Sequence, residues 1–238
     1  MIDTAPDNYS RTNRPKRAVI FDLDGVLVDT GWAHKQAWFA FAEKQGVDIS
    51  DDFFSATFGM TNDRILPMLF GRTLSSRQIK QLSDWKEQLY RRIIADKLAP
   101  DERLETLLAG LKKTGFSLAI GSSAPKANLD LIREHLRFDR YFDVYVTSDD
   151  VTEGKPSPQV FLKAAVKLLV PPRSCVVVED AVAGIEAAKA AKMAVIALTT
   201  TRSRSDLTKA NADLIFDSLA ELKPETIVKL LANRSSNS

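Results

Sequence analysis

Two carboxylates separated by a single residue, Asp22 and Asp24, follow a short apolar run in the segment AVIFDLDGVLVDT. Because side chains alternate along an extended strand, both carboxylates would point the same way while the residue between them points back towards the core. No basic residue stands within four positions of either, so the pair needs a divalent cation or a shifted pKa. Mg²⁺ is the natural candidate, since it prefers oxygen ligands and is commonly shared with a substrate phosphate.

An Asp-x-Asp-Gly segment is also typical of a simple turn that closes a core strand, with Gly25 permitting the change of direction. The later strand ends also carry polar groups, and this favours a catalytic or binding role for the acidic pair over a simple turn. Ser122 and Ser123 follow the apolar run 116–120, and their hydroxyls, with backbone N–H groups at the start of the next helix, would form a phosphate site. Serines at such positions also serve as helix caps, so this pattern alone leaves both interpretations open.

Charged residues stand at two further strand ends. Lys155, in the segment GKPSP, is either a solvated loop lysine or a cation that faces a phosphate. Glu179 and Asp180 come directly after three valines, and a buried strand rarely ends in two adjacent acids unless a cation meets them. They could instead be favourable charges at a helix N-terminus. The metal role is favoured because the first acidic pair independently requires a cation.

The surrounding pattern predicts an α/β fold. Beyond residue 100, apolar runs and helical stretches alternate in the way that specifies a doubly wound parallel sheet with helices on both faces. Ligands of such sheets bind outside the carboxyl ends of the strands, where the polar groups above are found. The expected strands are 18–21, 116–120, 144–147, 175–178, 194–198 and 214–216, and the expected helices between them are 101–114, 126–136, 158–169 and 181–191.

Between the first two strands the pattern is helical throughout. Helices are expected at 32–45, 50–58, 62–70 and 76–95. This stretch greatly exceeds an ordinary connection between a strand and a helix, so it predicts an inserted α-helical bundle. The alternative is an enlarged crossover connection whose only role is stability.

The segment DLDGVLVDT and the three later motifs, in this order, resemble the haloacid dehalogenase (HAD) superfamily, in the branch of β-phosphoglucomutase and its related sugar phosphatases. The resemblance extends over residues 18–222 and implies a Rossmann-like core with the inserted bundle placed over the active site as a cap domain. The expected division is a tail at 1–15, the core at 16–30 and 98–232, the cap at 31–97 and a second tail at 233–238.

The resemblance also implies roles for the motif residues. Asp22 would attack phosphorus and become an aspartyl phosphate, and Asp24 would act as general acid and base. Ser122 and Ser123 would bind the phosphoryl oxygens, and Lys155 would neutralise their charge. The implied Mg²⁺ ligands are Asp22, the main-chain carbonyl of Asp24, Glu179 and Asp180.

The cap segment departs from the mutase pattern. His34 and Lys86 match a histidine and a lysine that mutases use in cap closure and in binding the distal phosphate. Where the mutase motif carries two cations, however, this chain has Phe58 and Asn62. A mutase must retain a bisphosphate by its non-reacting phosphate, so the sequence favours a phosphatase that acts on a sugar or polyol phosphate. A phosphohexomutase and a non-catalytic protein that binds phosphorylated metabolites are the alternatives.

Composition and the missing motifs argue against several other classes of protein. A net charge of +2 in 238 residues gives no reason to expect nucleic acid or an anionic membrane as partner. No apolar stretch is long enough to span a membrane, the N-terminus lacks the apolar centre of a signal peptide, and the single cysteine, Cys175, cannot form an intrachain disulfide. We therefore expect a cytoplasmic monomer whose partner is a small phosphorylated metabolite. A dinucleotide-binding oxidoreductase is disfavoured because no Gly-x-Gly-x-x-Gly follows the first strand.

Overall fold

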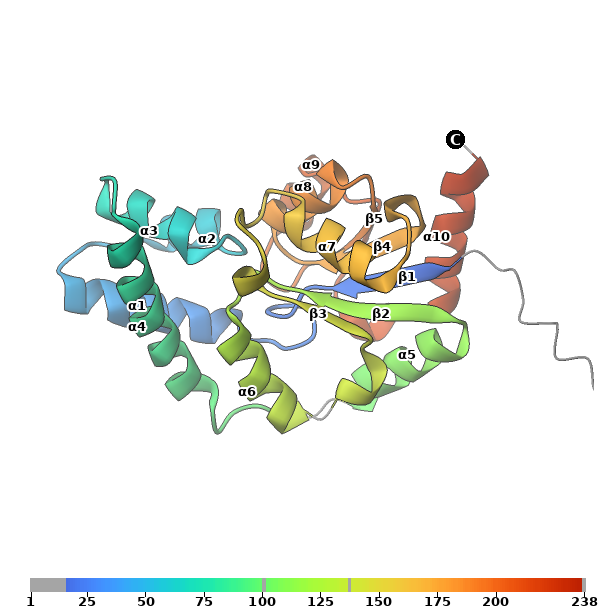
Figure 1. Ribbon diagram of the computed structural model, residues 1–238, viewed down its shortest axis with the longest axis horizontal. Coiled ribbons are helices and arrows are strands. Elements are labelled where there is room, and N and C mark those ends of the chain that lie inside the picture. Colours follow the sequence, from blue (N-terminus) through green and yellow to red (C-terminus); the bar gives the residue numbers. More distant parts are fainter. Residues whose placement is uncertain (1–15, 100–101, 137, 237–238) are drawn as a thin grey trace, which may run out of the picture.

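A six-stranded parallel sheet lies at the centre of the computed structural model, which describes residues 16–99, 102–136 and 138–236 (Figure 1). The strand order is β3-β2-β1-β4-β5-β6, and every neighbouring pair is parallel. The strands are β1 Arg17–Phe21, β2 Phe116–Gly121, β3 Val144–Val146, β4 Cys175–Glu179, β5 Ala194–Leu198 and β6 Leu214–Phe216.

The pairing of β1 with β4 determines where the chemical groups meet. Both strands are buried on both faces, which explains their nearly continuous apolar sequences. Phe21 is in register with Val178, and the backbone N–H of Asp22 donates to the Val178 carbonyl at 2.9 Å. Asp22, directly after β1, and Glu179, the last residue of β4, therefore carry their carboxylates to the same edge of the sheet.

Helices cover both faces of the sheet (Figure 1). On one face, α5, α6 and α10 contribute leucine and isoleucine side chains to a large apolar cluster with β1 and β2. On the other face, α7, α8 and α9 contribute alanine and larger apolar side chains to a second cluster. The bounds are α5 Glu102–Lys113, α6 Lys126–Leu136, α7 Gln159–Leu168, α8 Val182–Ala190, α9 Arg204–Lys209 and α10 Pro224–Ser236, with short 3-10 turns at Asp139–Tyr141, Ser148–Asp150, Pro172–Ser174 and Leu219–Glu221.

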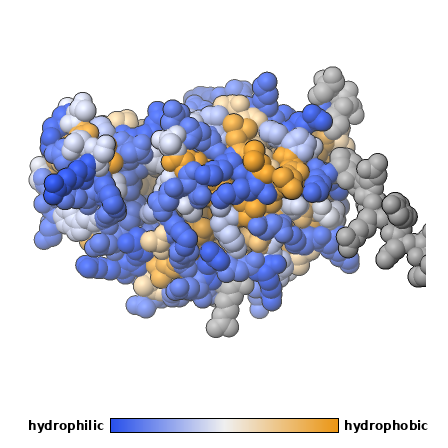
Figure 2. Space-filling view, in the orientation of Figure 1, coloured by the Kyte–Doolittle hydropathy of each residue, from blue (hydrophilic) through white to orange (hydrophobic). Residues whose placement is uncertain are grey.

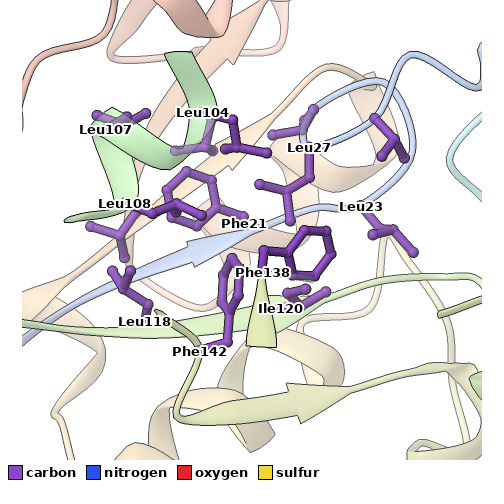
Figure 3. Close-up of a cluster of buried hydrophobic side chains, with 14 of the residues drawn as sticks. Phe21, Leu23, Leu27, Leu104, Leu107, Leu108, Leu118, Ile120, Phe138 and Phe142 are labelled. Carbon is purple, nitrogen blue, oxygen red and sulfur yellow. The ribbon is translucent and has the colours of Figure 1, made fainter. Parts of the chain in front are cut away.

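The larger cluster supports the strand that carries the first acidic pair. Figure 3 shows the leucines of α5 lying over Phe21, the last residue of β1. The ring of Phe142 meets that of Phe21 edge to face, with centroids 6.0 Å apart and planes at 89°. Phe21 is thus packed from both sides, which fixes the point at which the chain leaves the sheet.

The inserted cap consists of α1 Gly31–Gln45, α2 Asp51–Thr57, α3 Asn62–Phe70 and α4 Ser76–Ile94, and it lies to one side of the sheet (Figure 1). It has an apolar cluster of its own around Trp38, Phe41 and Leu66. Its helix ends follow local rules: Ser75 forms a reciprocal capping box at the start of α4, and Gly46 takes the left-handed conformation that ends α1.

The expected α/β class with its parallel sheet and inserted helical cap is confirmed. Some local expectations differ from the structure. The helix expected at 50–58 ends at Thr57, Phe58 lies in the turn that follows, and the helices α9 and α10 were not expected. The tail expected at 233–238 overlaps the end of α10, which continues to Ser236, and Arg234 lies 3.6 Å from the Asp213 carboxylate; the division into domains stays a prediction. The tail expected at 1–15 lies outside the described residues, as do 237–238.

The surface is mostly hydrophilic in the view of Figure 2, with hydrophobic residues gathered over and beside α7. Val166 on α7 and Leu169 directly after it are 72% and 74% exposed. Across the part of the chain that the structure describes, no helix has both the length and the apolar character that crossing a bilayer requires.

We expect Leu108→Ala to lower the free energy of unfolding by about 2–5 kcal/mol, because Leu108 is fully buried and its removal leaves a cavity beside β1. The same substitution at exposed Leu169 is the control and should change it by less than about 0.5 kcal/mol. Denaturant titrations followed by circular dichroism measure both values, and equal losses would contradict the assignment of the core.

Candidate active site

A buried lysine joins two of the strand ends. Lys155, in the loop before α7, places its Nζ 2.5 Å from Asp22 Oδ1 and 2.6 Å from Glu179 Oε1. Its side chain is 1% exposed, so water screens these contacts very little. The lysine thus fixes the carboxylates that follow β1 and end β4 in one arrangement.

Three carboxylates meet around this lysine. Asp22, Glu179 and Asp180 each offer an oxygen, and these oxygens lie within 4.8 Å of one another. Asp180 Oδ2 accepts a hydrogen bond from Thr201 Oγ1 at 2.6 Å, whereas the buried Oδ1 has no hydrogen-bond partner among the described residues. A buried, unpartnered carboxylate oxygen and an excess of negative charge fit a hard divalent cation such as Mg²⁺.

Burial and the neighbouring charges also shift the pKa values of these groups. Burial raises the pKa of Asp22 from 3.8 to about 7, even though the charge of Lys155 acts in the opposite direction. Burial and the neighbouring carboxylates of Glu179 and Asp22 raise the pKa of Asp180 well above its ordinary value. Burial alone would lower the pKa of Lys155, but Asp22 and Glu179 raise it, so this lysine stays protonated. A cation among the three carboxylates would favour their ionised forms.

Two glycines make this close packing possible. A Cβ on Gly184, in α8, would lie 1.7 Å from Glu179 Oε1. A Cβ on Gly25 would lie 2.0 Å from Asp180 Oδ2, and Gly25 also has a φ of +84°, which other residues rarely adopt. Glu179 is further fixed by the backbone N–H groups of Asp180 and Ala181, which donate to its Oε2 at 2.8 Å.

The Asp24 carboxylate is not a member of the acidic group but faces the cap. Its Oδ1 accepts hydrogen bonds from Thr30 Oγ1 at 2.5 Å and from Tyr90 OH at 2.7 Å, and it lies 3.1 Å from His34 Nε2. Burial acts to raise the pKa of Asp24, but the charge of His34 and these hydrogen bonds together hold it well below its ordinary value. The main-chain ligation of Mg²⁺ that the resemblance implied for Asp24 stays a prediction.

The two serines lie in the loop between β2 and α6. Ser122 is buried, and its Oγ accepts from the backbone N–H of Ala124 at 3.0 Å. Ser123 Oγ donates to the Gly59 carbonyl of the cap at 2.8 Å. Because α6 begins only at Lys126, the N–H groups nearest in the chain belong to this loop rather than to the first turn of the helix. One serine therefore stabilises the loop, and the other connects it to the cap.

A second buried charge cluster lies in the cap. Lys86 Nζ is 2.8 Å from His34 Nδ1 and 2.9 Å from Glu87 Oε1, and Asn62 Nδ2 donates to the same Glu87 oxygen at 2.8 Å. The structure thus brings together the three cap residues singled out in the sequence, although none of them contacts Asp22. His34 is buried and stacks on Tyr90 at 3.8 Å between ring centroids.

Sequence reasoning missed Glu87 and Tyr90. Both lie on α4, one and four residues after Lys86, and a spacing of four places side chains on one helix face. The spacing would have identified Tyr90 as a neighbour of Lys86. A glutamate beside a lysine on a helix usually indicates only a solvated face, so Glu87 gave no comparable signal.

A pocket lies between the cap and the carboxyl ends of the strands, and it is partly open to solvent. Asp22, Asp24 and the two serines line its core side. Its cap side combines the apolar residues Trp38, Phe58, Met60 and Ile65 with the polar residues His34, Asn62, Lys86 and Glu87. This lining suits a small molecule whose reacting end faces Asp22.

Comparisons with known proteins agree with the motifs. The family of haloacid dehalogenase-like hydrolases matches residues 19–198. The chain is 32% identical to a phosphorylated carbohydrates phosphatase of Thermotoga maritima, over 90% of this chain and 97% of the relative. It is 29% identical to hexitol phosphatase B of Escherichia coli, over 91% and 99%, and 34% identical to β-phosphoglucomutase of Bacillus subtilis, over 74% and 80%.

Among solved structures, the β-phosphoglucomutase of Clostridium difficile superposes with a TM-score of 0.80 at 29% identity, covering 93% of this chain and 99% of that one. The resemblance found in the sequence is thereby confirmed. Since the family match spans most of the chain and the relatives are phosphatases and a mutase, this protein is an enzyme that belongs to the haloacid dehalogenase-like hydrolases.

Proposed function

We propose that the enzyme is a Mg²⁺-dependent phosphatase that hydrolyses small sugar or polyol phosphates through an aspartyl phosphate on Asp22. The observation that carries this proposal is the grouping of Lys155, Glu179 and Asp180 around Asp22, which lines the pocket together with Asp24. Positioning and charge neutralisation are most of what phosphoryl transfer requires of a protein.

The reaction divides into two displacements. In the first, a carboxylate oxygen of Asp22 bonds to phosphorus, the ester P–O bond breaks, and the leaving oxygen takes a proton from Asp24. In the second, water attacks phosphorus and gives a proton to Asp24, the Asp22–phosphorus bond breaks, and inorganic phosphate is released. Lys155 orients Asp22 and neutralises charge on the phosphoryl group, which Ser122 and Ser123 bind from the neighbouring loop.

Mg²⁺ would be held by Asp22, Glu179 and Asp180, with the main-chain carbonyl of Asp24 as the additional ligand that family membership implies. When bound, the ion draws negative charge away from the phosphoryl oxygens. The unpartnered Oδ1 of Asp180 supports this assignment, because a buried carboxylate oxygen without a donor is costly unless a cation meets it.

Asp24 requires a proton in the first displacement, and its surroundings suggest how this need is met. The three groups that contact Oδ1 hold the carboxylate ionised, and two of them, His34 and Tyr90, belong to cap helices. Oδ2 accepts no hydrogen bond from the described residues, so it is the oxygen available to exchange a proton with the substrate. A shift of the cap that lengthens the contacts of His34 and Tyr90 would raise the pKa of Asp24 and favour its acid form.

Hydrolysis is favoured over mutase activity by the cap residues at the pocket. Phe58 is apolar and Asn62 is uncharged, and both line the pocket where mutases of this branch carry cations. Phosphate contacts with charged groups are worth about 1.5–3 kcal/mol each, so a bisphosphate intermediate would be retained poorly. A mutase remains the second candidate because Lys86 also lines the pocket and β-phosphoglucomutases are among the relatives.

We expect phosphate release from sugar and polyol monophosphates to exceed conversion of β-glucose 1-phosphate to glucose 6-phosphate by at least about tenfold, even with the bisphosphate supplied. Phosphate release and a coupled glucose 6-phosphate dehydrogenase assay on the same sample measure the two rates. Isomerisation faster than phosphate release would instead identify a mutase.

Asp22→Asn should fold normally and lose both phosphate release and isomerisation in the same assays, because the amide cannot attack phosphorus.

We expect Asp180→Ala to raise the Mg²⁺ concentration needed for half-maximal activity by about tenfold or more, because it removes a buried ligand. Asp48→Ala, which removes an exposed carboxylate in the cap, is the control and should leave this concentration unchanged. Titration of Mg²⁺ against activity tests both variants, and an unchanged midpoint in Asp180→Ala would return this residue to a structural role.

We also expect Mg²⁺ to raise the melting temperature more at pH 7.5 than at pH 5. Without metal, the folded-state pKa of Asp22 is raised from 3.8 to about 7, so between these values the folded state binds more protons than the unfolded state. Stability of the metal-free protein therefore falls as the pH rises through this window, and Mg²⁺, which requires ionised ligands, restores it. Thermal unfolding in EDTA and in Mg²⁺ measures the difference, and an equal gain at both pH values would contradict the assignment.

A further inference from the structure

We propose that Glu87 determines specificity by neutralising Lys86, so that the cap accepts a hydroxyl-bearing leaving group and rejects a second phosphate. This inference rests on the proposed function and names the substrate class more closely: monophosphates whose remaining part is uncharged. Lys86 is the only lysine or arginine among the described residues that line the pocket. Whatever engages its charge therefore decides whether the cap attracts an anion.

The Glu87 carboxylate forms a direct ion pair with the Lys86 ammonium group. Its Oε1 lies 2.9 Å from Lys86 Nζ, and both side chains are almost fully buried, at 2% and 5% exposure. His34 Nδ1 takes another position around the same ammonium group at 2.8 Å. A phosphate approaching Lys86 would also approach the Glu87 carboxylate, which lines the same pocket, and the repulsion would offset the attraction.

Glu87 itself is held in place from two directions. Asn62 donates to Oε1 at 2.8 Å, and Asn128 of the core helix α6 donates to Oε2 at 2.6 Å. Arg91, one turn further along α4, donates to Asn128 Oδ1 at 2.8 Å and so fixes the orientation of that amide. The carboxylate cannot turn away from Lys86 without breaking a buried hydrogen bond, which is unfavourable.

The charge of Glu87 persists at neutral pH. Burial acts to raise the pKa of Glu87, but Lys86, His34 and the hydrogen bonds lower it to about 2. The Lys86–Glu87 pair therefore has no net charge under working conditions. Its oxygens and the Asn62 amide are hydrogen-bonding groups suited to hydroxyls, while Trp38 and Phe58 offer apolar surface to the carbon skeleton.

The test is equilibrium binding to Asp22→Asn, which cannot turn the ligands over. Fructose 1,6-bisphosphate and fructose 6-phosphate are titrated calorimetrically in Mg²⁺ with and without Glu87→Gln. We expect Glu87→Gln to tighten binding of the bisphosphate by about tenfold or more and to change that of the monophosphate by less than about threefold. Equal changes for both ligands would overturn the proposal.

Two further variants isolate the charge of Lys86. Asp84→Asn, the control, removes an exposed carboxylate three residues before Glu87 on α4, where it pairs with Lys80, and should leave both affinities unchanged. Lys86→Met combined with Glu87→Gln should lose the gain in bisphosphate affinity. A gain that persists in the double variant would overturn the proposal, because the liberated ammonium group would not be its cause.

Ligand binding to Asp22→Asn with native Glu87 can be measured whether or not the Glu87 variant folds. Bisphosphate should bind it no more tightly than monophosphate, and a bisphosphate preference of tenfold or more would refute the role of Glu87. Phosphate release by the native enzyme tests the proposed function separately. Absence of hydrolysis with the expected binding pattern would reject the phosphatase assignment and leave the role of Glu87 standing.

Discussion

The contact of Lys155 with Asp22 and Glu179 is the interaction on which the rest of the site depends. One buried ammonium group compensates part of the charge of three buried carboxylates, and burial together with the remaining negative charge raises the pKa values of Asp22 and Asp180. The register of β1 with β4 and the close approach at Gly25 and Gly184 bring these groups together. Loss of the lysine would leave an uncompensated acidic cluster, which is strongly destabilising in a protein interior.

Most of the core site followed from the sequence because parallel strands end at one edge of the sheet. Apolar runs that stop at polar residues placed Asp22, Ser122 and Glu179 at this edge, and the structure has them there. Strand alternation was less reliable for Asp24. Since β1 ends at Phe21, the chain has already left the sheet, and the donors of the cap rather than the pleat direct this carboxylate.

The cap cluster was predictable only in part. Helical spacing placed residues on faces of α4 but did not say what those faces would meet, since that depends on contacts between segments far apart in the sequence. Asn128 is the clearest case: it lies 41 residues from Glu87, on a core helix, and nothing in its own surroundings indicates a cap contact. The contact of Ser123 with the Gly59 carbonyl is of the same kind, at a separation of 64 residues.

The separate apolar cluster of the cap, around Trp38, Phe41 and Leu66, has an evolutionary consequence. Destabilising substitutions within this small cluster act first on the cap, whereas Ala33, Ala37, Tyr90 and Ile94 of the cap helices pack in the same cluster as Phe21. Residues at the pocket, such as Phe58 and Met60, are thereby free to diverge while the inherited phosphoryl-transfer machinery is preserved. A lineage with this architecture acquires new substrates by substitutions on the cap side of the pocket, and relatives with the same core fold then act on different metabolites.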